Sequence, residues 1–164
     1  MKLADKIVHQ TQPTPTSCTA TCVAMSVGIP VGQLGVDLTK SYDFDRAGIW
    51  YAERGIWLRI GVRIGGYGER LKGDSLYLVG IRSQNRVGID HSVFLDTRGE
   101  RLIGEGVHER SHWKTYDPNK GNDGKNYIEW VDEHYLLDFA ELTQRDNRYV
   151  MFGRAPGQHD EGGC

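Results

Sequence analysis

The chain has 164 residues, 38% of them hydrophobic, which is enough for one folded domain with its own core. Its net charge of −2 disfavours a general nucleic-acid-binding protein, because such proteins are normally basic. No apolar run approaches the ~18 residues of a membrane span, so we expect no membrane partner.

The first predicted element is an apolar helix that follows an extended arm. Pro13 and Pro15 restrict their own backbone and that of the preceding residue, which favours the extended arm. Thr16 or Ser17 can then cap a helix by accepting a backbone N–H bond. The helix is predicted over residues 18–27, before a Gly-Ile-Pro stop. Because it has no wide polar face, we expect it to be buried.

Cys18 is predicted to be the first residue of that helix. There the thiol meets unpaired backbone N–H groups and the positive end of the helix dipole, and both favour the thiolate form. Most free cysteines are small buried hydrophobic residues, which is our interpretation of Cys22, one turn further along. Three cysteines is an odd number, and we interpret all of them, including Cys164, as free thiols of a reducing cytoplasm.

The remaining elements change from short helices to strands along the chain. The first half is predicted to contain a weak helix at 31–42, a turn at 43–46, a short helix at 47–54, a strand at 57–64 and a glycine-rich loop at 65–74. The second half is predicted to contain strands at 76–81, 87–95, 101–103 and 113–116, a polar loop at 119–125, a helix at 127–142 and a strand at 148–153. A buried N-terminal helix followed by a mostly antiparallel sheet is an α+β fold. We expect residues 1–154 to form one domain and residues 155–164 a flexible C-terminal tail.

Three polar residues suit a reactive thiol. His91 lies in the predicted strand 87–95, where a lone histidine is more often simply packed, but a general base also needs a rigid element. Asp117 precedes Pro118, and it is either a turn residue or the group that accepts a bond from His91 and sets its tautomer. Gln12 on the arm is either a surface residue or an amide donor to an oxyanion.

These residues carry a family resemblance. The run Cys-Thr-Ala-Thr-Cys-Val-Ala-Met at Cys18, with Gln12 six residues before it, resembles the start of the double-glycine leader peptidases. These are bacteriocin-processing papain-like cysteine peptidases with the chain order Gln, Cys, His, Asp, which His91 and Asp117 continue here. The resemblance implies a papain-like fold without a cofactor. It also implies that Cys18 is the nucleophile, His91 the base, Asp117 its orienting partner and Gln12 the oxyanion donor. Thr19 departs from the family, which usually has glycine there, and two interpretations stay open: its side chain narrows the groove, or it marks a relative with another substrate.

We therefore expect a cysteine peptidase-like thiol hydrolase that cleaves a peptide or isopeptide bond in a protein or peptide substrate. Two alternatives stay open. One is a catalytically silent binding protein that captures or inhibits a partner protein in the groove. The other is a deamidase or transglutaminase that uses the same triad. The sequence leaves the oligomeric state open.

A competing pattern lies at residues 108–112, His-Glu-Arg-Ser-His, which matches the zinc-protease motif of two histidines one helical turn apart. That chemistry requires a helix, so that both imidazoles face one metal ion. Gly104 and Gly106 precede the motif and Pro118 follows it closely, which favours a solvated loop. We therefore expect no zinc site.

Overall fold

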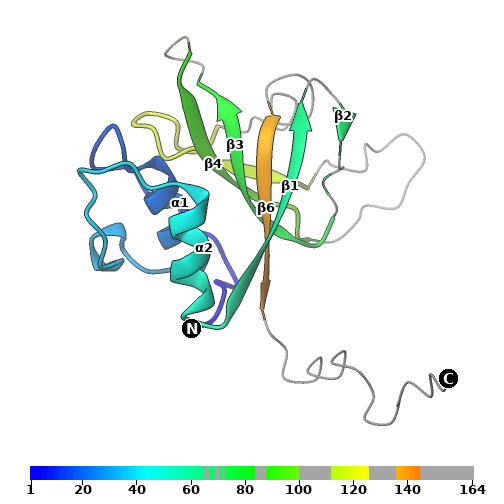
Figure 1. Cartoon of the computed structure of the whole chain (residues 1–164), viewed down its shortest axis with the longest axis horizontal. Coiled ribbons are helices and arrows are strands. Elements are labelled where there is room, and N and C mark those ends of the chain that lie inside the picture. Colours follow the sequence, from blue (N-terminus) through cyan, green and yellow to red (C-terminus); the bar gives the residue numbers. More distant parts are fainter. Residues whose placement is uncertain are drawn as a thin grey trace, which may run out of the picture.

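In the described part of the chain, two α-helices lie together on one side of an antiparallel sheet (Figure 1). The computed structural model describes residues 1–64, 67–68, 71, 73–83, 88–99, 112–125 and 136–144. Its elements are α1 (Cys18–Val27), the 3₁₀ helix η1 (Val31–Gln33), α2 (Phe44–Ala52), β1 (Ile56–Ile64), β2 (Tyr67–Gly68), β3 (Leu76–Arg82), β4 (Asp90–Asp96), β5 (Lys114–Tyr116) and β6 (Leu136–Gln144). The α+β prediction is confirmed.

The sheet has the strand order β2-β1-β6-β3-β4-β5, and each pair of neighbours is antiparallel. β6 lies between β1 and β3, so that Leu142 pairs with Leu58 on one side and with Leu76 on the other. At the other end of the sheet, β4 pairs with β3 and places His91 beside Ile81. The sheet is therefore completed by its last strand in sequence.

The helix predicted at 127–142 is wrong where the structure describes it, because residues 136–142 belong to β6. The backbone of β6 forms ladders with a strand on each side. Phe139 and Ala140, on opposite faces, are both fully buried. A central strand covered on both faces loses the alternation that identifies strands, so its apolar spacing resembles a helix. Residues 127–135 lie outside the described part.

The predicted start and burial of the first helix are confirmed. α1 begins at Cys18, and every residue of Thr19–Val27 is buried. Two of its buried hydroxyls bond backbone carbonyls of the preceding turn: Thr21 donates to the Ser17 carbonyl at 2.8 Å, and Ser26 donates to the Val23 carbonyl at 2.6 Å. Because these hydroxyls have partners, burying them carries little penalty.

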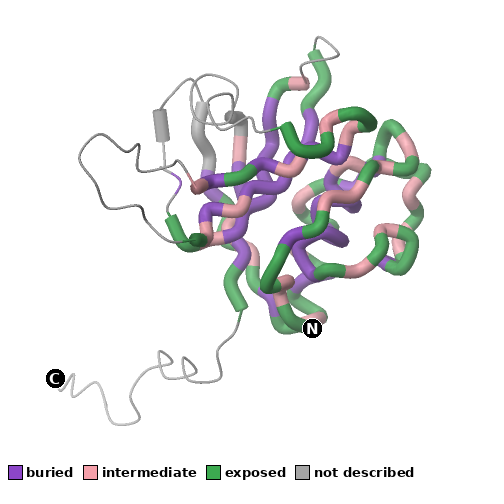
Figure 2. The backbone as a smooth tube through the Cα atoms, turned by 180° about the vertical axis from the view of Figure 1, so that it is seen from behind, coloured by how far each residue is buried: buried purple, intermediate pink, exposed green. Residues whose placement is uncertain are grey.

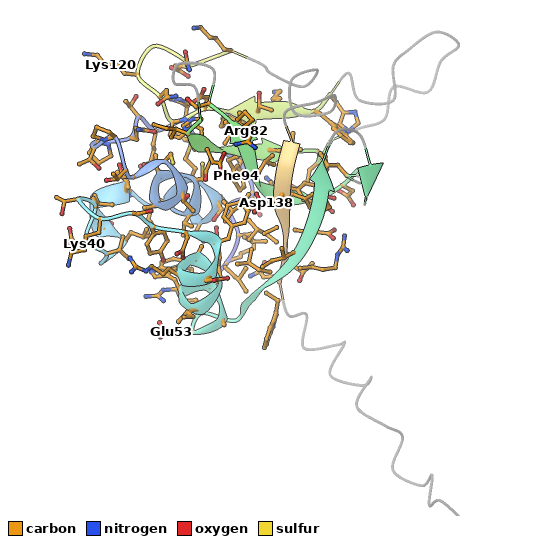
Figure 3. All side chains as sticks on the ribbon, turned by 45° about the horizontal axis from the view of Figure 1, so that its top comes forward. Lys40, Glu53, Arg82, Phe94, Lys120 and Asp138 are labelled. Atoms are coloured by element: carbon orange, nitrogen blue, oxygen red, sulfur yellow. The ribbon has the colours of Figure 1, made fainter. Side chains whose placement is uncertain are left out.

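Buried side chains of the helices and of the sheet pack together into one core between the two layers (Figure 2). Figure 3 labels one of its members, Phe94 of β4, which is fully buried. The core includes Val23, Met25, Trp50, Tyr51, Leu76, Leu78, Phe94 and Leu142. This packing holds the start of α1 against β4, where the candidate site lies.

The cap of α1 differs from the prediction. Ser17 occupies the N-cap position, but its side chain makes no capping bond. Its hydroxyl instead accepts from the Thr14 N–H at 3.1 Å and donates to the Thr14 carbonyl at 2.9 Å. The hydroxyl thus closes a turn in the arm, and the first N–H groups of α1 receive no acceptor from the Ser17 side chain. The C-terminal stop is as predicted, since Gly28 is left-handed with φ of 69°.

The boundaries of the other early elements also shift. α2 starts at Phe44 and not at residue 47, because Asp43 caps it by accepting the Arg46 N–H at 2.9 Å. The weak helix at 31–42 is reduced to η1, and Gly35, with φ of 76°, leaves the helical region directly after it.

The strands predicted at 57–64, 76–81, 87–95 and 113–116 are confirmed as β1, β3, β4 and β5, with end shifts of one to three residues. The strands predicted at 101–103 and 148–153 and the tail at 155–164 lie outside the described residues, so the domain limits stay a prediction. No helix within the described ranges is long and apolar enough to cross a membrane.

Two glycines allow side chains of β6 to lie across its neighbours. Gly61 on β1 pairs with Phe139, whose ring occupies the space where a Cβ of residue 61 would stand. Gly80 on β3 pairs with Asp138, which Figure 3 labels, and the Asp138 carboxylate lies in the corresponding space. These close approaches require residues without a Cβ.

Candidate active site

The four residues singled out from the sequence lie together. A pocket of about 220 Å³ opens where the arm, the start of α1, the β3–β4 hairpin and the loop after β5 meet. Its lining residues are Gln12, Pro15, Cys18, Ser83, Ile89, Asp90, His91 and Asn119. Asp117 is 5% exposed and lies behind His91.

Contacts between α1 and β4 place Cys18 beside His91. The Thr19 hydroxyl bonds the Ser92 hydroxyl at 2.7 Å, and the Cys22 thiol donates to the Ser92 carbonyl at 3.6 Å. These contacts fix the first turn of α1 against the residue that follows His91. Cys18 and His91 both line the pocket, and each shifts the pKa of the other.

Thr19 does not narrow the pocket. Its side chain is 4% exposed, bonds Ser92 and is not among the lining residues. The Thr19 side chain faces the sheet, where it contacts Ser92, and it lies outside the pocket. The sequence alone does not show this direction. Of the two interpretations of Thr19, the narrowed groove is therefore not found in this pocket.

The ring of His91 is held by a buried carboxylate. His91 Nε2 donates to Asp117 Oδ1 at 2.8 Å. The same oxygen accepts the Asn119 N–H at 2.8 Å, and Oδ2 accepts from Asn122 Nδ2 at 2.7 Å. Because Nε2 is engaged with Asp117, Nδ1 is the ring nitrogen left for the thiol. This arrangement fixes both the tautomer and the plane of the ring.

Electrostatics in the pocket favour a charged thiol–imidazole pair. Burial raises the pKa of Cys18, but hydrogen bonds from His91 and from the backbone of Ser92 and Thr19 outweigh it and lower that pKa to about 7. Burial lowers the pKa of His91, but hydrogen bonds with Asp117 and Cys18 raise it to about 9. Between these values the pair is a thiolate beside an imidazolium.

The Asp117 carboxylate stays ionised behind this pair. Burial raises its pKa, but bonds from His91, the Asn119 backbone and Asn122 lower it below the usual value. By contrast, burial raises the pKa of the Cys22 thiol well above its usual value, and nearby Cys18 and Asp117 raise it further. The same helix therefore carries one thiol suited to ionise and one that stays protonated.

Gln12 reaches the pocket from the arm. Its backbone N–H donates to the Pro118 carbonyl at 2.7 Å, which ties the arm to the Asp117 loop. Its side-chain Nε2 donates to the Thr14 carbonyl at 3.0 Å, and Oε1 is buried without a partner among the described residues. An unpaired buried acceptor costs about 1–3 kcal/mol, which points to a site shaped for something other than stability.

No family model and no curated protein matches this chain. The resemblance described above therefore depends on a few residues and on the geometry that they adopt.

The loop after β5 contributes residues that sequence reasoning missed. Asn119 and Asn122 hold the two oxygens of Asp117, and their short spacing after the Asp-Pro turn was the available signal. His9 donates from Nε2 to the Asp117 carbonyl at 2.7 Å. No local pattern connects two residues 108 positions apart, so the role of His9 had no signal in the sequence.

The competing zinc motif is described only at its end. His112 lies in a turn before β5, and its Nε2 donates to the Thr97 carbonyl at 3.0 Å. His108 lies outside the described residues. Within the described ranges, no group of three His, Cys, Asp or Glu side chains is placed to hold a metal ion. The absence of zinc stays a prediction.

Iodoacetamide should modify Cys18 long before Cys22, in a Cys164→Ser background. At pH 6, a thiol of pKa about 7 is about ninety times more ionised than one of pKa 9.0. Its lower basicity reduces its nucleophilicity about eightfold, so the net gain over a model thiol is about tenfold. Mass spectrometry of timed samples measures both sites. Labelling of Cys18 at the rate of a model thiol, or of Cys22 first, contradicts this expectation.

Proposed function

We propose that the protein is a papain-like thiol hydrolase, similar to the double-glycine leader peptidases, that cleaves a peptide or isopeptide bond in a protein or peptide. The observation that supports it best is that His91, which lines the pocket with Cys18 and lowers the pKa of its thiol, also donates to a buried Asp117. A histidine packed only for stability does not need to bond a thiol at a helix start on one side and a buried carboxylate on the other.

In the proposed reaction, the Cys18 thiolate attacks the scissile carbonyl carbon and its oxygen becomes an oxyanion. The Cys18 N–H and a Gln12 amide hydrogen donate to that oxyanion. The His91 imidazolium then protonates the leaving amine as the C–N bond breaks, which leaves a thioester on Cys18. Neutral His91 removes a proton from water, the hydroxide attacks the thioester, and the thiolate is released with the acid product.

The lowered pKa of Cys18 favours an enzyme over a binding protein, since capture of a partner does not require an ionised thiol. Thr19 supports the same choice, because its buried side chain does not line the pocket beside Cys18. A reducing cytoplasm, which we propose as the location, keeps Cys18 as the thiol that the reaction needs.

A peptide library incubated with the protein tests the proposal. We expect new amine termini by mass spectrometry and none with the Cys18→Ala variant. The rate should rise as the pH increases through about 7, where Cys18 ionises, and fall as it passes about 9, where His91 loses its proton. A protein whose Cys18 is alkylated rapidly but which cleaves no peptide and transfers no acyl group is the binding protein instead.

Replacing Gln12 by alanine should reduce turnover roughly 100-fold, the scale for loss of one oxyanion donor. Its side chain has one bond to Thr14 and a buried unpaired oxygen, so the melting temperature should change little. Gln10 provides the matched control, because its amide bonds the Ile29 carbonyl at 2.7 Å and the Val31 N–H at 2.9 Å. Gln10→Ala should lower stability and leave the turnover of the folded protein unchanged. The reverse pattern assigns Gln12 a structural role.

A further inference from the structure

Asn119 has two separate contacts with the His91–Asp117 pair. Its backbone N–H donates to Asp117 Oδ1, whereas its side-chain amide lies 3.2 Å from His91 Nε2. The same nitrogen bonds Asp117 Oδ1 at 2.8 Å. Asn119 and His91 both line the pocket.

The proton on Nε2 determines which end of the amide faces His91. In the thiolate–imidazolium pair, Nδ1–H points to Cys18 and Nε2–H points to Asp117. An amide N–H directed at Nε2 would place one donor against another, which is repulsive. Rotation of the amide by 180° exchanges its oxygen and nitrogen without moving any other atom. The favoured rotamer therefore presents Oδ1 to His91.

We propose that the Asn119 side chain is a second acceptor for the Nε2 proton of His91, and thus a positioning residue that shares this work with Asp117. Its kinetic consequence rests on the proposed thiol hydrolase. Nε2–H of the protonated His91 ring then has two acceptors, the Asp117 carboxylate and the neutral Asn119 amide. Loss of the amide should therefore make His91 release its proton more easily.

Few other charged groups act on His91 within the described residues. Cys18 faces it from α1, and Asp117 faces it from the loop after β5. Asp90, its neighbour on β4, lines the pocket and is paired with Arg82 of β3 at 3.2 Å, and both side chains are exposed. Substitution of Asn119 by alanine changes no charge around His91, so a change in the titration of His91 in that variant reports on the amide itself.

The test compares Asn119→Ala with Asn122→Ala in the Cys164→Ser background. Both variants remove an asparagine of the same loop, and both leave the backbone bond to Asp117, but only Asn119 reaches His91. NMR titration of the His91 ring should show a pKa lower by roughly half a unit to one unit in Asn119→Ala, the effect of one lost hydrogen bond. Absorbance at 240 nm should show less Cys18 thiolate at pH 7 in that variant. Asn122→Ala should shift the His91 titration less.

The Asn119→Asp variant tests whether the side chain at this position accepts the His91 proton or donates to the substrate. It keeps an acceptor oxygen beside Nε2, so it should raise the pKa of His91 and extend peptide cleavage to higher pH. If Asn119 instead acts as an N–H donor to substrate, both variants should lose cleavage alike, and Asn119→Ala should leave the titration of His91 unchanged. Asn119→Asp raises the pKa of His91 in either case, because it adds a negative charge beside the ring, so cleavage is the property that this variant tests. An unchanged titration in Asn119→Ala overturns the proposal, whether or not peptides are cleaved. The predicted shift without peptide cleavage supports the acceptor and rejects the hydrolase.

Discussion

His91→Ala should reduce peptide cleavage by roughly 10⁴- to 10⁶-fold, because loss of the base in such a triad removes nearly all of its catalysis. The variant also loses the ring that stabilises the thiolate. Burial of Cys18 remains and raises the pKa of its thiol, with only backbone hydrogen bonds left to oppose it. Alkylation of Cys18 at pH 7 should therefore slow as well. Cleavage kinetics and alkylation rates, measured against pH on the same preparations, check both expectations.

His112→Ala is the matched control for His91→Ala. It removes an imidazole that bonds the Thr97 carbonyl outside the pocket, so it should affect stability and not the reactivity of Cys18. Far-UV circular dichroism shows whether each variant is folded. A folded His91→Ala protein that is alkylated at pH 7 as fast as the parent would remove the basis for the proposed hydrolase.

Gly61→Ala should lower the free energy of unfolding by about 3 kcal/mol, at the upper end of the cost of an added core methyl group. The new Cβ would lie 2.7 Å from Cε2 of the Phe139 ring. That ring is fully buried and packs edge-on against Tyr77, with ring centroids 5.7 Å apart, so it has little room to move. For a chain of this size we expect a fall in melting temperature of about 6–12 °C. Thermal and urea unfolding measure the change.

Gly73→Ala is the control, because its added Cβ would meet no atom within 4 Å and its backbone is not left-handed. It should alter stability by no more than about 0.5 kcal/mol. Equal stability of the Gly61→Ala and Gly73→Ala variants would show that Phe139 moves aside, and that the pairing of β1 with β6 tolerates a side chain at this position.

Elements with strong local signals were predictable from the sequence. The proline-stiffened arm, the start of α1 at Cys18 and the turn at Gly28 follow from neighbouring residues alone. β3 was predictable because it is a compact apolar run. Cys18, His91 and Asp117 were suggested by their types and order, which a family resemblance supplied.

Features that depend on distant contacts were not predictable. β6 was assigned to a helix because only its pairing with β1 and β3 stabilises it as a strand. The direction of the Thr19 side chain depends on Ser92, 73 residues later. The contribution of Asn119 depends on where β4 and the loop after β5 meet. Each of these requires knowledge of the folded arrangement.

The central place of β6 has a consequence for biosynthesis. On the ribosome, β1 and β3 emerge long before the strand that will lie between them. Until then the facing edges of both strands offer unpaired N–H and C=O groups, and such edges can join with those of other chains. We expect the nascent chain to need protection by a chaperone until Gln144 has left the exit tunnel. Slower translation of the preceding codons would lengthen this vulnerable interval and increase aggregation.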